Sequence, residues 1–80
     1  MIVIYVLKSE KNEILYVGMT ENLNRRIKEH NAAKCKFTSG HMPWKLIYYE
    51  SAENFEKARK REKYLKSAAG KLFIRKRMNE

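Results

Sequence analysis

The chain has 80 residues, and 18 Lys and Arg against 9 Asp and Glu give it a formal net charge of +9 and an isoelectric point near 9.9. This length predicts a single domain over residues 1–80, with a core that stabilises the fold by only about 3–5 kcal/mol. Cys35 is the only cysteine, which excludes a disulfide or a cysteine-ligated zinc site within one chain. The apolar start at residues 2–7 is too short to span a membrane and lacks the flanks of a signal peptide, so we expect a cytoplasmic protein.

More than half of the basic residues fall between Lys57 and Arg77. Such a surface attracts a polyanion, and DNA contacted through its phosphates is the leading candidate. A basic surface without any polyanion partner stays open as the alternative, whereas a membrane ranks low because few large apolar residues interrupt the basic helix. The side chains that we expect to contact nucleic acid are those of Arg25, Lys34, Lys36, Arg59, Arg61, Lys63 and Lys66.

The N-terminal part of the chain predicts a β-hairpin. Residues 2–7 are β-rich and apolar on both faces, which is typical of a buried strand, and residues 14–17 predict a second strand that the next glycine ends. If the turn is centred between residues 10 and 11, Tyr5 faces Tyr16 directly across the hairpin, on one face of the sheet.

A helix is expected next, capped by Thr20 and running to about His30. Its aliphatic residues Leu23 and Ile27 form an i, i+4 pair, and Arg26 and His30 complete the same stripe. After this helix, the expected elements are a loop at 31–43, a strand at 44–50, a helix at 55–67 capped by Asn54 and, after a break at Gly70, a short basic helix at 71–78. Glu62 lies in the middle of the inner stripe of the helix at 55–67, which consists of Phe55, Ala58, Glu62, Leu65 and Ala69.

Five residues capable of phosphodiester chemistry therefore stand where hydrophobic side chains are expected: Tyr5, Tyr16, Arg26, His30 and Glu62. The guanidinium of Arg26 matches phosphate oxygens, and a lone carboxylate at Glu62 suits a magnesium ion that water and phosphate complete. Each residue also has a structural alternative. Arg26 and Glu62 could pair with each other, His30 could be a satisfied boundary histidine, and the tyrosines could be packing residues.

At these residues the chain resembles the GIY-YIG nuclease family, in its small single-domain branch related to the nuclease domain of the bacterial excision-repair incision subunit. Val3-Ile4-Tyr5 stands at the first motif and Tyr16-Val17-Gly18 at the second, and Arg26 and His30 follow at the family's spacing. Residues 61–66 resemble the family's glutamate helix. The resemblance implies an α+β fold, with a three-stranded antiparallel sheet flanked by helices in the order β-β-α-β-α-α, and a bacterial source.

The resemblance also implies an endonuclease that hydrolyses DNA phosphodiester bonds with low sequence preference, in DNA repair or recombination. Tyr16 would be the general base or would position the water, and Tyr5 would support its hydrogen-bond network. Arg26 would stabilise charge on the scissile phosphate, and His30 would touch the phosphate or assist proton transfer. Glu62 would ligate one Mg²⁺ or Mn²⁺ ion.

The sequence departs from the family pattern at three positions. Val3 replaces the glycine of the first motif, Met19 stands where the repair enzymes carry lysine, and Asn79 is the only asparagine beyond the glutamate helix. A nucleic-acid-binding module without turnover is therefore the alternative function. A structural or partner-binding domain is a third one.

Overall fold

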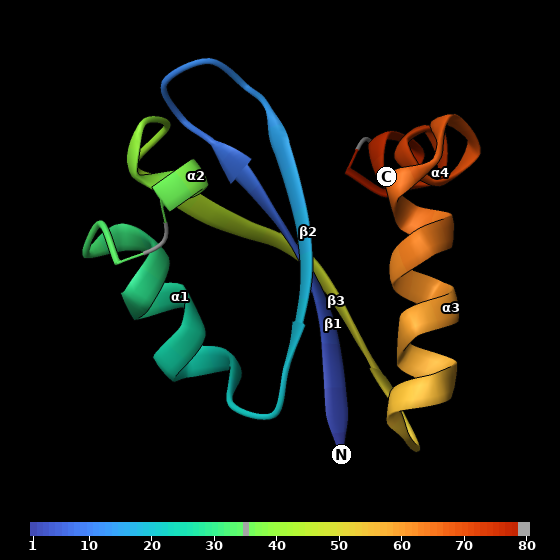
Figure 1. Ribbon diagram of the computed structural model, residues 1–80. Coiled ribbons are helices and arrows are strands. Elements are labelled where there is room, and N and C mark those ends of the chain that lie inside the picture. Colours follow the sequence, from blue (N-terminus) through green and yellow to red (C-terminus); the bar gives the residue numbers. More distant parts are fainter. Residues whose placement is uncertain (35, 79–80) are drawn as a thin grey trace.

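The computed structural model describes residues 1–34 and 36–78, so Cys35 and Asn79 lie outside the described residues (Figure 1). The elements are β1 (Ile2–Ser9), β2 (Leu15–Thr20), α1 (Leu23–Asn31), α2 (Lys36–Ser39), β3 (Trp44–Ala52), α3 (Phe55–Lys66) and α4 (Ala68–Met78). The expected three-stranded antiparallel sheet with flanking helices is confirmed. The loop predicted at 31–43 contains one additional short helix, α2. In the described part of the chain, no helix is long and apolar enough to cross a membrane.

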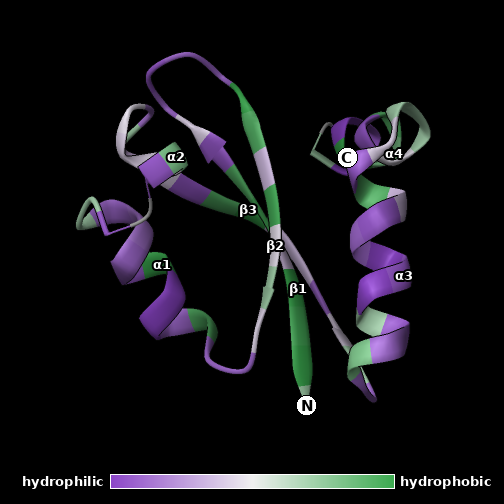
Figure 2. Ribbon diagram, in the orientation of Figure 1, coloured by the Kyte–Doolittle hydropathy of each residue, from purple (hydrophilic) through white to green (hydrophobic). Residues whose placement is uncertain are grey.

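The sheet has the strand order β2-β1-β3, so β1 is central and the other two strands form the edges. Helices cover both faces: α1 and α2 lie on one side, and α3 and α4 lie on the other (Figure 1). The alternation of side chains along β1 supplies both cores. Ile4 and Val6 pack with residues of α3 and α4, whereas Tyr5 and Leu7 pack with residues near α1. Hydrophobic colour accordingly concentrates on the strands, and α1 and α3 are mostly hydrophilic (Figure 2).

The register of the hairpin differs from the prediction by two residues. Tyr5 pairs with Gly18 rather than with Tyr16. The reason is a loop centred one position later than expected: Ser9 donates its N–H to the carbonyl of residue 14, and Glu13 adopts a positive φ of 62° that closes the turn. Because a shift of two residues preserves the side-chain face, Tyr5 and Tyr16 still lie on the same face as diagonal neighbours.

Gly18 does not end the second strand, which continues to Thr20. A Cβ atom at position 18 would lie 2.5 Å from the hydroxyl of Tyr5, so only glycine lets this phenol lie over the neighbouring strand. Because Thr20 is still part of β2, the predicted N-cap moves to Asn22, whose side chain accepts the N–H of Arg25 at 3.1 Å.

The second half of the chain follows the prediction more closely. Asn54 caps α3 by accepting the N–H of Lys57 at 2.9 Å, as expected. The predicted break at Gly70 is wrong, because Gly70 lies inside α4 and is buried. A Cβ at this position would collide with the carbonyl of Tyr64 and lie 2.5 Å from the Cα of Leu65. Gly70 therefore allows α4 to pack directly against the end of α3.

Candidate active site

A buried hydrogen-bond chain connects β1, α1 and α2. The hydroxyl of Tyr5 lies 2.9 Å from Nε2 of His30, and Nδ1 of His30 lies 2.9 Å from the hydroxyl of Thr38. Trp44 extends the chain by donating its indole N–H to the carbonyl of Thr38 at 2.8 Å. Tyr5, His30 and Thr38 are essentially inaccessible to solvent. The chain therefore fixes the positions of two of the predicted site residues from inside the molecule.

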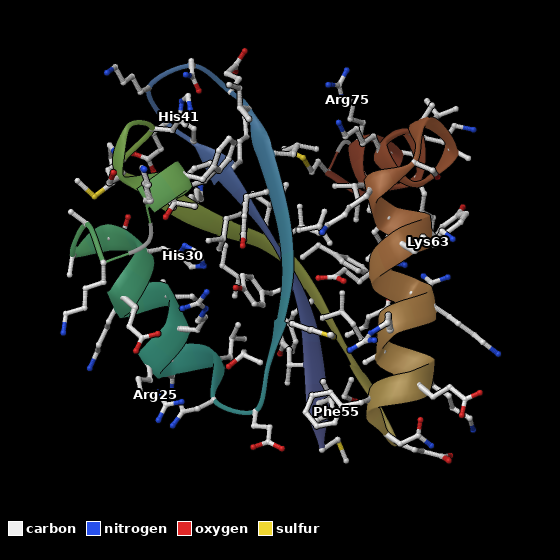
Figure 3. All side chains as sticks on the ribbon, viewed as in Figure 1. Arg25, His30, His41, Phe55, Lys63 and Arg75 are labelled. Carbon is white, nitrogen blue, oxygen red and sulfur yellow. The ribbon has the colours of Figure 1, made fainter. Side chains whose placement is uncertain are left out.

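His30 is held in its neutral form. Burial lowers the pKa of its imidazole below the usual 6.5, and the nearby charge of Arg26 lowers it further, against a smaller opposing effect of Glu29. His30 points from α1 toward the sheet, whereas Arg25 lies at the other end of the helix and points outward (Figure 3). A direct contact between His30 and a phosphate does not fit this burial. The geometry fits a residue that orients Tyr5.

Tyr16 stands at the boundary between this buried chain and the solvent, and it is half-buried. Its ring meets His30 edge-on with centroids 4.9 Å apart and stacks with Phe37 at 6.0 Å. The rings of Trp44 and Tyr5 lie at 6.1 and 6.3 Å. Aromatic neighbours therefore surround the phenol on several sides.

The hollow next to Tyr16 lies along the free edge of β2. It measures about 320 Å³, and its lining residues come from β2, α2, α3 and α4: Leu15, Tyr16, Val17, Phe37, Lys66 and Lys71. The two lysines make one wall of this hollow cationic. Because Phe37 belongs to the α1 side and Lys66 to the α3 side, the hollow connects the two helical layers around the edge of the sheet.

Arg26 and Glu62 are not paired with each other in the described chain. The Nη1 atom of Arg26 lies 3.1 Å from Oε1 of Glu29, one turn along α1. Glu62 lies 3.7 Å from the ammonium of Lys66, one turn along α3. The structure therefore gives each residue a partner within its own helix, and the alternative of an Arg26–Glu62 pair is wrong.

Glu62 lies on the helix that covers the opposite face of the sheet from Tyr5 and His30. The five candidate residues thus do not gather on one sheet face, because four of them belong to the α1 side. Glu62 is linked to the hollow beside Tyr16 only by its ion pair with Lys66, which lines that hollow.

The Glu62 side chain is 20% exposed. Among residues 1–34 and 36–78, no group of three or more metal-binding side chains occurs. One accessible carboxylate with a cationic neighbour fits a magnesium or manganese ion only as a single protein ligand, with the other ligands coming from water and phosphate.

The residues predicted to contact nucleic acid fall into two groups. Arg61 has a structural role, because it donates two hydrogen bonds of 2.8 and 2.9 Å to Glu50 and lies over the ring of Tyr64. The others are exposed: Arg25, Lys34, Lys36, Arg59, Lys63 and Lys66. Of these, Lys66 lines the hollow beside Tyr16, whereas Arg59 and Lys63 lie with Phe55 on the surface of α3.

The sequence-based prediction missed three residues of this region. Thr38 gave no signal, because it belongs to an apparent loop without periodicity. Phe37 is 57% exposed, an unusual exposure for a phenylalanine beside a lysine-rich hollow, but burial cannot be read from a single residue type. Lys71 could have been found from its position four residues before Arg75 on a basic helix.

Comparison with known proteins identifies the class of this fold and site. The GIY-YIG catalytic domain matches residues 1–79, and the chain belongs to this family. Several of its relatives carry the name UPF0213. UPF0213 protein CPE1444 of Clostridium perfringens is 48% identical over 64 residues, which cover 79% of this chain and 68% of the relative.

Related sequences also occur outside bacteria. A UPF0213 protein of Autographa californica nuclear polyhedrosis virus is 36% identical over 74 residues, covering 88% of this chain and 68% of the relative. Among solved structures, UPF0213 protein BH0048 of Bacillus halodurans resembles this chain with a TM-score of 0.56 and 29% identity. That match covers 92% of this chain and 82% of the other.

Proposed function

We propose that this protein is a divalent-metal-dependent endonuclease that hydrolyses phosphodiester bonds of DNA with low sequence preference. The observation that carries the proposal is the position of Tyr16: a phenol braced by aromatic rings on one side and open to a lysine-lined hollow on the other. Membership of the GIY-YIG catalytic domain family supports the same chemistry. A single domain over residues 1–80, a kinship with the excision-repair incision subunit and a role in DNA repair or recombination belong to the same proposal.

In this proposal Tyr16 accepts a proton from the attacking water or orients that water. The lysines of the hollow place positive charge beside the ring, where it attracts the phosphate. Tyr5 does not meet the substrate. It is bound to His30 at 2.9 Å, and the two residues hold the sheet surface beneath Tyr16 in place. Arg26 stabilises negative charge on the scissile phosphate after its guanidinium has exchanged Glu29 for the phosphate. This exchange costs little, because the Arg26–Glu29 ion pair is partly exposed to solvent.

Glu62 is the residue that would hold the metal ion. A bound Mg²⁺ or Mn²⁺ supplies charge neutralisation at the phosphate and at the leaving oxygen. The ammonium of Lys66, now 3.7 Å from the carboxylate, then becomes available to the nucleic acid. The exposed lysines and arginines hold the DNA backbone without reading bases, so affinity should fall steeply with salt.

The test is a nicking assay with supercoiled and branched DNA, with magnesium or manganese and with EDTA. The wild-type protein should nick the DNA only with metal, and Glu62→Gln should lose at least about 100-fold in rate. Glu56→Gln removes a carboxylate of the same helix, 81% exposed and one turn from Lys60, and serves as the matched control. Equal nicking by wild-type protein and Glu62→Gln would mean that the activity is a contaminant.

A nucleic-acid-binding module without turnover is the second candidate. The observation that favours it is the Lys66–Glu62 ion pair, which already neutralises the carboxylate that a metal would need. This function predicts salt-sensitive DNA binding, little metal affinity of the protein, and tolerance of Tyr16→Phe. Magnesium titration followed by NMR at Glu62, with and without a short duplex, distinguishes the two candidates.

A further inference from the structure

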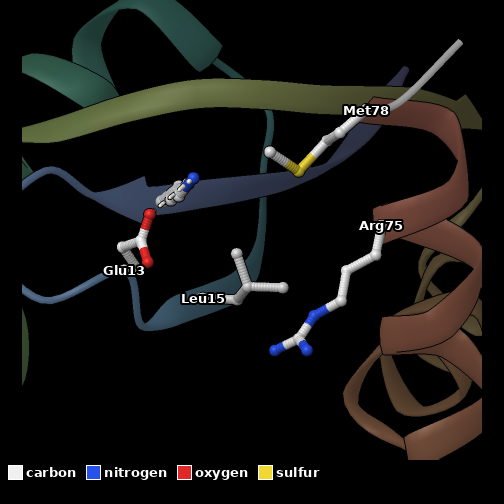
Figure 4. A pocket seen from close by; sticks show the side chains of 5 residues that line it. Glu13, Leu15, Arg75 and Met78 are labelled. Carbon is white, nitrogen blue, oxygen red and sulfur yellow. Dashed lines mark ion pairs between the residues drawn. The ribbon is translucent and has the colours of Figure 1, made fainter.

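A second hollow lies between the β1–β2 hairpin and the C-terminal half of α4. It measures about 270 Å³ and is lined by Lys8, Glu13, Leu15, Arg75 and Met78 (Figure 4). Lys8 and Leu15 occupy paired positions of β1 and β2, so the floor of the hollow is the regular sheet. None of the catalytic roles proposed above uses it.

The charges of this hollow suit an anion. The ammonium of Lys8 lies 3.3 Å from the carboxylate of Glu13, whose side chain is 79% exposed. Arg75 meets no carboxylate among residues 1–34 and 36–78, and its guanidinium is turned toward Leu15 and the open space (Figure 4). An unpaired guanidinium presents a planar fork of donors that matches two phosphate oxygens.

This hollow is a neighbour of the one beside Tyr16. Leu15 lines both of them, so it forms the wall that they share. Lys71 and Arg75 are four residues apart on α4 and line one hollow each. An i, i+4 pair is separated by about 6 Å along the helix axis, which is close to the spacing of successive phosphates along an extended strand.

We propose that the hollow of Lys8 and Arg75 binds a backbone phosphate of the same nucleic-acid strand that passes Tyr16, one nucleotide away from the phosphate beside Lys71. The nucleic-acid strand would follow the edge of β2, and Lys71 and Arg75 of α4 would contact successive phosphates. The inference rests on the proposed function for its substrate but concerns binding, not cleavage. Glu13 acts as a weak competitor: phosphate displaces its exposed carboxylate from Lys8 at little cost, because exposed pairs are weak.

The test measures the affinity of the full chain for a labelled oligonucleotide by fluorescence anisotropy in EDTA, over a series of chloride concentrations. Arg75→Gln should weaken binding roughly three- to tenfold and reduce the slope of log K against log salt by about 0.7–0.9, the effect of one lost phosphate contact. Glu13→Gln should tighten binding. Lys76→Gln is the matched control, because Lys76 is an exposed cation of the same helix that lines neither hollow.

Equal effects of Arg75→Gln and Lys76→Gln on the slope would overturn the proposal, since net charge alone would then explain the binding. Strong competition by inorganic phosphate at constant ionic strength, lost in Arg75→Gln, would also overturn it in favour of a site for free anions. Absence of cleavage by a wild-type protein that still binds through Arg75 contradicts only the proposed function. Absence of binding by the wild-type protein contradicts both proposals.

Discussion

The two faces of the sheet bury different kinds of side chain. The face under α3 and α4 is aliphatic: Ile4, Val6, Leu65 and Ile74 are fully or almost fully buried there. The face under α1 and α2 buries Tyr5 and Trp44 together with the polar side chains of His30 and Thr38. Aliphatic burial stabilises without directional requirements, whereas a buried polar chain stabilises only when every member has its partner. One strand, β1, supplies both faces through its alternation.

The comparison suggests a division of labour. The α3–α4 face holds the larger aliphatic cluster, and the α1–α2 face holds the groups other than Glu62 that we assign to chemistry. Substitutions of the buried aliphatic residues on the first face should therefore change stability at constant specific activity. Substitution of Tyr16 on the second face should change activity first.

Leu65→Ala should have the largest effect. Leu65 is fully buried in the aliphatic core, and its truncation should lower the free energy of unfolding by about 2–5 kcal/mol, measured by urea denaturation. The rate of DNA nicking per folded molecule should stay unchanged. Leu72→Ala is the control, because Leu72 is 56% exposed and its loss should cost under about 0.5 kcal/mol. A large loss of specific activity in folded Leu65→Ala would contradict the division.

Tyr16→Phe should show the opposite pattern. It removes one hydroxyl at the open side of the aromatic group, so the nicking rate should fall by at least about 100-fold while the free energy of unfolding changes by less than about 1 kcal/mol. Tyr49→Phe provides the control, because Tyr49 is 61% exposed on β3. Retention of the wild-type rate by Tyr16→Phe would exclude Tyr16 as the general base and favour the binding module.

Thr38→Val tests the buried polar chain. The substitution keeps the shape but leaves Nδ1 of His30 without the hydroxyl that now lies 2.9 Å away, so we expect a loss of about 1–3 kcal/mol. Thr38→Ser keeps the hydroxyl and should lose less. The tautomer of His30, followed by NMR of its ring nitrogens, should change in the valine variant and stay the same in the serine variant. Unchanged ring signals in Thr38→Val would show that Thr38 does not position His30.

The fold was largely predictable because its signals are local. The apolar run of β1 and the cap at Asn54 depend on neighbours along the chain, and they appear where expected. Of the predicted inner stripe of α3, only Ala58 and Leu65 are buried, whereas Phe55 is exposed and Ala69 belongs to α4. The errors arose where a distant contact decides. Gly18 looked like the end of a strand until the hydroxyl of Tyr5 explained it, and Gly70 looked like a helix breaker until its contact with α3 was visible.

The candidate site was predictable as a set of residues but not as an arrangement. Spacing and residue type selected Tyr16, Arg26 and His30, yet no periodicity indicates which face of the sheet a helix covers. The sequence could therefore not show that α3, which carries Glu62, packs on the face opposite Tyr5 and His30. Likewise, the partners of His30 were hidden, because Thr38 lies in a segment whose position depends on tertiary contacts.

The smallest expected effect is a difference in pH dependence between the two faces. On the α1–α2 face, the pKa of His30 is lowered below 6.5 by burial, so the unfolded chain binds this proton more readily than the folded one. The folded state therefore has its full stability with respect to His30 above pH 6.5. This stability decreases as the pH falls from 6.5 through the pKa of His30 in the folded state. On the α3–α4 face, hydrogen bonds from Arg61 lower the pKa of Glu50 below 4.5, so its contribution is lost only at pH values below 4.5.

Urea denaturation over a pH series should therefore show two steps of destabilisation in the wild-type protein. His30→Gln should remove the step that begins near pH 6.5, and Glu50→Gln should remove the lower one, each leaving the other step in place. His41→Gln is the control for a histidine outside the buried chain and should keep both steps. If His30→Gln retained the upper step, the protonation of another group would cause that step. The inference that His30 is neutral in the folded protein would then have no support.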